Sequence, residues 1–95
     1  MLEELKAQAY NILSKCDSDK QIDMAIEEMS ELTKALLKDR RYQRISTQRD
    51  VIEELADVYN MLEQVRIIYA FNDDDIVRIR SNKNIRTLER LKHDD

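Results

Sequence analysis

The chain has 95 residues, the length of one domain, and it contains neither glycine nor proline. The lack of glycine excludes Gly-rich phosphate-binding loops, and a net charge of −4 argues against general nucleic-acid binding. The single cysteine, Cys16, cannot form an intrachain disulfide, which fits a reducing compartment. No apolar run approaches the roughly 18 residues of a membrane span, and the N-terminus has no signal-peptide pattern. We therefore expect one cytoplasmic domain over residues 1–95, without a membrane partner.

Apolar residues recur at steps of three and four along most of the chain, which predicts an all-α fold of four amphipathic helices. The first helix is expected from Leu2 to Cys16. Ser18, with Gln21 three residues later, has the spacing of a capping box and is expected to open the second helix. That helix is expected to end near residues 37–38.

The polar and basic segment 39–48 is predicted to be a loop. The third helix has the clearest apolar stripe, from Val51 to Tyr69, and Thr47 or the serine before it can cap its first turn. Residues 72–75 (Asn-Asp-Asp-Asp) end this pattern and supply acidic residues that the helix dipole favours at the start of a fourth helix. A chain of this length buries only a little over ~60% of its unfolded surface, so a second copy would supply the missing partner surface.

Two acidic motifs stand out, Glu28-x-x-Glu31 and Glu54-x-x-Asp57, with 22 residues between them. Residues three apart are neighbours on one helix face, and all four acids border the apolar stripes at about 100° per residue. If the two helices pack side by side, four carboxylates converge and repel one another unless a cation joins them. Hard oxygen ligands, with no histidine or cysteine nearby, indicate Mg²⁺, or Mn²⁺ as a substitute. The alternative interpretation is that these are boundary residues in salt bridges with nearby Lys and Arg.

With Glu27 and Glu53 beside them, the two motifs resemble the E-x-x-E … E-x-x-D signature of the MazG-like superfamily of all-α nucleotide pyrophosphohydrolases. The resemblance covers about residues 20–91 and is greatest to the short MazG-like proteins of phages and their bacterial hosts. It includes a basic K-x-x-R series in the fourth helix, here Lys83 and Arg86 followed by Arg90. The resemblance implies a four-helix MazG-like chain that forms an intersubunit helical bundle, as a homodimer or homotetramer.

The resemblance also implies a reaction, the Mg²⁺-dependent hydrolysis of a nucleoside triphosphate (NTP or dNTP) to the monophosphate and pyrophosphate. The metal ligands would be Glu28, Glu31, Glu54 and Asp57. One carboxylate would also act as the general base, for which Glu31 is favoured and Glu28 is the other candidate. The outer phosphates and the sugar or base would be contacted by Lys83, Arg86 and Asn60.

Two other functions are compatible with the sequence. The first is a non-catalytic helical interaction or regulatory protein, a degenerate MazG-like scaffold, which fits the small size, the 38% of charged residues and the strong stripe of the third helix. The second is nucleic-acid binding through the arginines of segment 40–49, which the acidic net charge opposes.

Overall fold

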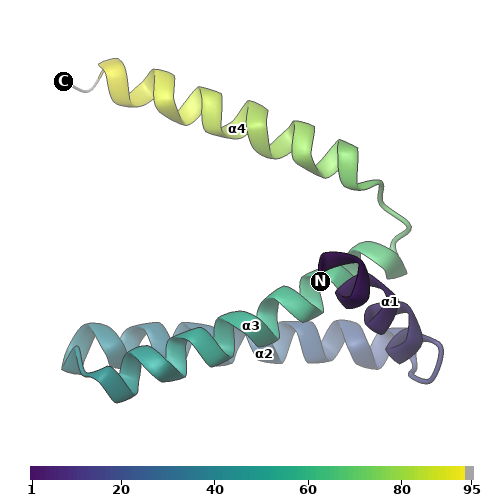
Figure 1. Cartoon of the computed structure of the whole chain (residues 1–95). Coiled ribbons are helices and arrows are strands. Elements are labelled where there is room, and N and C mark those ends of the chain that lie inside the picture. Colours follow the sequence, from purple (N-terminus) through teal and green to yellow (C-terminus); the bar gives the residue numbers. More distant parts are fainter. Residues whose placement is uncertain (94–95) are drawn as a thin grey trace.

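The computed structural model in Figure 1 describes residues 1–93, and all regular secondary structure among these residues is helical. The helices are α1 (Leu2–Leu13), α2 (Ser18–Tyr42), α3 (Ile45–Ile68) and α4 (Asp73–His93). The predicted all-α, four-helix fold is therefore confirmed for this part of the chain; the last two residues of the predicted 1–95 domain lie outside the described residues. None of the four helices is both long enough and apolar enough to cross a membrane.

The start of α2 differs from the prediction. The carboxylate of Asp17 caps the helix by accepting a hydrogen bond from the backbone N–H of Lys20 at 3.1 Å, so the capping box predicted at Ser18 is wrong. Gln21, its expected partner, instead donates to the side-chain oxygen of Gln64 on α3 at 2.8 Å. Gln64 is only 4% exposed. Because buried amides need partners, this bond favours one alignment of α2 against α3.

The predicted loop over 39–48 is also wrong, because only Gln43 and Arg44 separate α2 from α3. Gln43 takes a left-handed conformation with φ of 50°, and its N–H bonds the carbonyl of Asp39 at 2.7 Å. The buried hydroxyl of Thr47 donates to the Asp39 carboxylate at 2.7 Å and accepts from the N–H of Arg44 at 3.0 Å. These side-chain bonds hold a tight link that the polar composition of the segment did not reveal.

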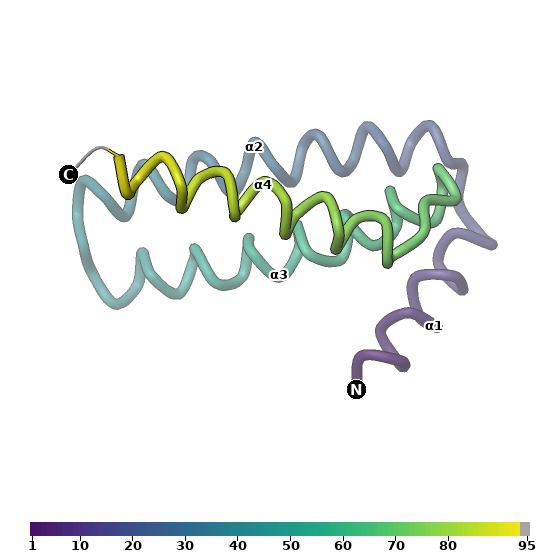
Figure 2. Tube along the Cα trace, turned by 90° about the horizontal axis from the view of Figure 1, so that it is seen from above, coloured from purple at the N-terminus to yellow at the C-terminus, as the bar shows by residue number. Residues whose placement is uncertain are grey.

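The core lies where α2 and α3 pack side by side as an antiparallel hairpin (Figures 1 and 2). Ala25 and Ala35 on α2 and Val58 and Met61 on α3 are all buried in the chain. The two alanines have short side chains, which suits a close approach of the helices. α1 contacts α3 as well and buries Ala9.

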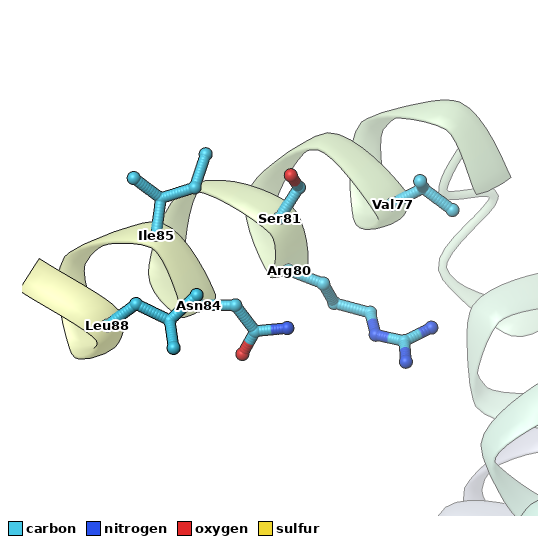
Figure 3. A pocket seen from close by; sticks show the side chains of 6 residues that line it. All are labelled: Val77, Arg80, Ser81, Asn84, Ile85 and Leu88. Atoms are coloured by element: carbon cyan, nitrogen blue, oxygen red, sulfur yellow. The ribbon is translucent and has the colours of Figure 1, made fainter.

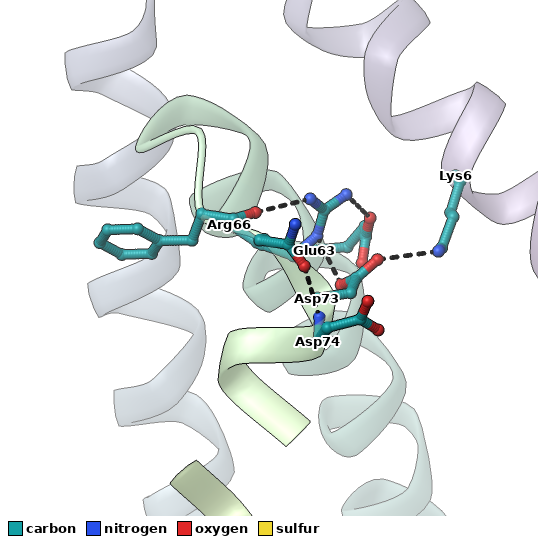
Figure 4. Close-up of polar contacts among 7 residues, drawn as sticks. Lys6, Glu63, Arg66, Asp73 and Asp74 are labelled. Carbon is teal, nitrogen blue, oxygen red and sulfur yellow. Dashed lines mark hydrogen bonds and ion pairs between the residues drawn. The ribbon is translucent and has the colours of Figure 1, made fainter. Parts of the chain in front are cut away.

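α4 stands apart from this hairpin (Figure 1), and none of its described residues is buried. The corner before α4 is held by a polar network around Arg66 (Figure 4). The guanidinium of Arg66 donates to the carbonyl of Phe71 at 3.0 Å and forms ion pairs with Glu63 at 2.6 Å and with Asp73 at 3.0 Å. Lys6 of α1 binds the same Asp73 at 2.9 Å. The network thus ties the first residue of α4 to both α3 and α1.

Candidate metal centre

Three carboxylates from the two acidic motifs meet between α2 and α3. Glu28, Glu54 and Asp57 each offer one oxygen, and these oxygens all lie within 4.8 Å of one another. Glu28 stands three residues after the buried Ala25, and Glu54 stands four residues before the buried Val58. Both glutamates therefore share the face on which the helices pack, and the convergence follows from the antiparallel hairpin itself.

The burial of the three side chains is graded. Glu28 and Glu54 are half-buried, whereas Asp57 is exposed. The group therefore has its base in the seam of the hairpin and opens to solvent at Asp57. A molecule arriving from solvent can reach it without any movement of the two helices.

The electrostatics of the group are unfavourable in the absence of a cation. The pKa of Glu28 is raised above its ordinary value, first by burial and then by the negative charges of Asp57 and Glu31. The pKa of Glu54 is raised by the same causes, burial first, then Asp57 and Glu28. Among residues 1–93, no Lys or Arg forms a salt bridge with any of the three. For these three carboxylates, the ion pairs of the alternative interpretation are thus not formed in the described chain.

Glu31, the fourth predicted ligand, lies outside the group of three. Its side chain is exposed and pairs with Lys34 one turn further along α2 at 3.5 Å. Its charge nevertheless raises the pKa of both Glu28 and Glu54, so it stands near the group. The structure therefore brings three of the four predicted ligands together, with Glu31 at their margin.

The other predicted site residues are more scattered. Asn60 is exposed on α3, one turn after Asp57. Lys83 and Arg86 are exposed on α4, which stands away from the hairpin (Figure 1). A single copy of the chain therefore does not bring the basic pair to the carboxylates.

An open depression runs along α4 and includes none of the acidic motif residues (Figure 3). Its walls mix apolar and polar side chains and carry one charge, that of an arginine; they comprise Val77, Arg80, Ser81, Asn84, Ile85 and Leu88. These residues recur at steps of three and four, so they form one face of a single helix. The depression is a helix surface, and it offers no carboxylates for a metal.

Two further sets of residues were not predicted as partners from the sequence. One is the buried Gln21–Gln64 bond, and the other is the network of Lys6, Arg66 and Asp73 at the start of α4. The members of each set lie far apart in sequence. Only the acidic run at 72–75 gave a signal, and it pointed to a helix start rather than to ion pairs.

The donor set fits a hard divalent cation. All three groups are carboxylates, with no nitrogen or sulfur donor among them, which suits Mg²⁺ or Mn²⁺ better than zinc. Mg²⁺ characteristically binds through a few carboxylates and keeps several waters, and a group open on one side leaves room for them. Glu28, Glu54 and Asp57 are therefore suited to hold such an ion.

Comparisons of the chain with protein-family models, with curated proteins and with solved structures found no match. Function therefore has to be inferred from the residues themselves.

Proposed function

We propose that this chain is a Mg²⁺-dependent nucleoside triphosphate pyrophosphohydrolase of the MazG-like type, which hydrolyses an NTP or dNTP to the monophosphate and pyrophosphate. The observation that carries the proposal is the meeting of Glu28, Glu54 and Asp57 within 4.8 Å. These three residues come from two motifs whose order and spacing resemble those of that superfamily. Mn²⁺ would serve as a substitute, because it accepts the same oxygen donors.

Each residue of the site has a role in this proposal. Mg²⁺ held by Glu28, Glu54 and Asp57 would neutralise phosphate charge and lower the pKa of the attacking water. Glu31, exposed and outside the group of three, would accept the proton of that water as general base. Glu28 is the other candidate, since its raised pKa brings it closer to neutral pH. Asn60, one turn from Asp57, would contact the sugar or base.

The assembly belongs to the proposal as well. Lys83 and Arg86 would bind the outer phosphates through charge-assisted hydrogen bonds. Since α4 stands away from its own hairpin, they would do so at the carboxylates of another subunit, in a homodimer or homotetramer with an intersubunit helical bundle.

The test is an assay of purified protein with each common NTP and dNTP, including dUTP, with and without Mg²⁺. We expect metal-dependent release of pyrophosphate and of the matching monophosphate. Glu54→Gln should abolish this release, whereas Glu53→Gln, which changes the neighbouring exposed acid outside the group, should preserve it. Absence of release from every nucleotide, by protein of intact helical content, would rule out the enzyme.

A second candidate is a non-catalytic helical interaction protein that retains the metal site as a degenerate scaffold. The observation that favours it is the large exposed apolar surface, which includes α4 residues Ile85, Leu88 and Leu91 at 54–59% exposure. One result distinguishes the enzyme from the non-catalytic interaction protein. A protein that is stabilised by Mg²⁺ through Glu54 and Asp57, yet releases no pyrophosphate, would be the scaffold.

A further inference from the structure

The side of α3 that faces away from Asp57 carries an exposed apolar stripe, here called the outer stripe. At 100° per residue, its members follow one another at steps of three, four or seven and lie roughly opposite Asp57 around the helix. Their exposure ranges from 36% to 80%, and they are Ile45, Ile52, Leu55, Tyr59, Leu62 and Tyr69. Alternating steps of three and four are the pattern of a seam between helices that pack side by side. In the described chain this seam is uncovered except at its C-terminal end, where Tyr69 stacks on Phe71 and the side chain of Arg66, only 14% exposed, lies in the corner network.

α2 extends the same apolar surface. Ile26, Met29 and Leu36 are 44–56% exposed and recur at helical steps on the side of α2 away from Glu31. Because the two helices are antiparallel, their handedness places this side next to the outer stripe. One side of the hairpin is therefore apolar, and the carboxylates open on the other.

The chain exposes more surface than a monomeric protein of its mass, as expected for a subunit of an oligomer. A monomeric protein of 11.3 kDa is expected to expose about 5,700 Å², whereas this chain exposes 8059 Å². The excess of about 2,300 Å² per chain, or about 4,600 Å² for a pair of chains, lies in the range of total area that obligate homodimers bury. The radius of gyration, 16.4 Å, likewise exceeds the ~12 Å of a compact domain of this length.

The order of residues along the outer stripe identifies the occupant. Read from either end, the stripe has the same sequence of apolar and polar positions: one apolar, one polar, four apolar, one polar and one apolar. If two copies pack antiparallel, Ile52 faces Leu62, Leu55 faces Tyr59 and Ile45 faces Tyr69. The two polar positions, Gln48 and the Arg66 that anchors the corner network, also occupy matching places. A two-fold interface requires such self-complementarity, since residue i meets j and j meets i.

A parallel arrangement is less favourable. It would set the two Arg66 positions against each other, although each guanidinium is largely buried and already held by Glu63 and Asp73, so neither can pack against its counterpart. It would also crowd both corner networks, with Lys6 and Asp73, at one end of the dimer.

We propose that a second copy of this chain covers the outer stripe, with the two α3 helices packed antiparallel about a two-fold axis near the middle of α3. This interface specifies the assembly within the proposed function, and it leaves the carboxylates of both copies facing outward.

The first test is the mass in solution, measured by sedimentation or by light scattering after size exclusion. We expect wild-type protein to have at least twice the mass of one chain. Tyr59→Glu places a charge in the stripe at a side chain that is 66% exposed in the single chain, so the hairpin should persist, as circular dichroism can check. The dimer should then weaken at least 100-fold. The matched control is Leu2→Glu, at a 75% exposed apolar residue of α1, which should leave the dimer intact.

The second test is disulfide trapping in a Cys16→Ser background, which removes the native thiol. An antiparallel pair places Ile52→Cys next to Leu62→Cys of the other copy, whereas two Ile52→Cys thiols would be separated by about 15 Å along the helix axis, too far to bond. Mixing the two variants should therefore give a mixed disulfide that neither variant forms alone.

Three results would overturn the interface: a monomeric wild type at a chain concentration of about 100 µM, an intact Tyr59→Glu dimer, or self-linked Ile52→Cys. None of these readouts involves turnover. Loss of the enzyme proposal would therefore leave the interface standing, and loss of the interface would leave the nucleotide assay to decide the enzyme.

Discussion

The α2–α3 hairpin and α4 are both amphipathic, yet their surroundings differ. The hairpin buries apolar side chains such as Val58 and Met61, which are 6% and 7% exposed. α4 buries none of its described residues, and its Leu88 is 59% exposed. The comparison teaches that apolar periodicity predicts a helix and its contact face, but leaves open whether the contact lies within the chain or in a neighbour.

The two regions also differ in charge. The hairpin gathers the carboxylates Glu28, Glu54 and Asp57 without a paired cation in the described chain. Residues 76–93 of α4 carry Lys and Arg almost to the exclusion of acids, with Glu89 as the exception. Under the proposed function the two regions divide the work, because metal ligands come from the hairpin and phosphate ligands from α4.

The largest expected effect separates these two roles. Glu54→Gln combined with Asp57→Asn should lower pyrophosphate release at saturating nucleotide at least ~100-fold, since metal-ion catalysis supplies several kcal/mol. Lys83→Ala combined with Arg86→Ala should mainly raise KM for the nucleotide and leave the requirement for Mg²⁺ unchanged. Steady-state kinetics over a range of nucleotide and Mg²⁺ concentrations distinguish the two patterns.

An equal loss of metal dependence in both double variants would contradict the assignment of metal binding to the hairpin and of phosphate binding to α4. The matched control is Glu53→Gln, which changes an exposed acid of α3 outside the group of three. Circular dichroism of each variant checks that helical content is kept.

Stability provides the next comparison. Met61→Ala should lower the free energy of unfolding by ~2–5 kcal/mol, because it leaves a cavity in the core. Leu88→Ala removes a similar volume from a side chain that is 59% exposed, so it should cost no more than ~0.5 kcal/mol in a single chain. Urea unfolding of both variants measures the difference. A loss above ~1 kcal/mol at Leu88 would show that α4 is covered in solution. The hairpin and α4 would then differ in whether their apolar faces pack within one chain or against another.

The sequence predicted the parts of the molecule that depend on local periodicity. The stripe of the third helix placed Glu54 on the buried face, and the spacing of the motifs allowed Glu28 to meet it, as the structure shows. The position of the Glu31 carboxylate could not be predicted. A small rotation of α2 is enough to decide whether that side chain joins the group of three or pairs with Lys34. Spacing of three residues defines a face only to within tens of degrees.

The remaining errors arose where side chains override composition. The polar composition of segment 39–48 predicts a loop. In the structure, the side chains of Thr47 and Asp39 form a hydrogen bond that holds Gln43 in a left-handed turn without glycine. The direction of α4 depends on Arg66 and Asp73, whose ion pair has no sequence periodicity. Contacts of this kind form only when the chain has folded, and no local pattern in the sequence marks them.

Added metal should stabilise the hairpin selectively. Binding to the folded state raises the free energy of unfolding by about 2.7 kcal/mol when Mg²⁺ is at 100 times its dissociation constant. For a chain of this size, that corresponds to a rise in melting temperature of at least ~10 °C. Glu54→Gln with Asp57→Asn should remove the rise, and Lys83→Ala with Arg86→Ala should keep it. A melting temperature of the wild type that is indifferent to Mg²⁺ and Mn²⁺ would argue against the metal centre.

The smallest effect is the dependence of stability on pH in the presence of a chelator. The folded-state pKa of Glu28 and of Glu54 lies above the ordinary value of 4.5, so below pH 4.5 these groups are protonated in both states and contribute little. As the pH rises from 4.5 through the raised folded-state values, the unfolded chain releases its protons first. The folded state then binds more protons, and the free energy of unfolding falls with increasing pH.

At strongly acidic pH the trend should be the opposite, and stability should fall as the pH is lowered, because Asp73 then determines the pH dependence. Asp73, at the start of α4, has a pKa below its ordinary 3.8, chiefly because Lys6 donates a hydrogen bond to it, so its stabilising contribution disappears as the pH falls through the lowered value. Melting temperature should therefore decline as the pH rises from about 4.5 through the raised folded-state pKa values of Glu28 and Glu54, which is the upper limb, and should also decline at strongly acidic pH, which is the acidic limb. Glu54→Gln, or added Mg²⁺, should flatten the upper limb and leave the acidic limb in place, whereas Asp73→Asn should do the converse. If Glu54→Gln left the upper limb unchanged, the repulsion within the hairpin would not be its cause.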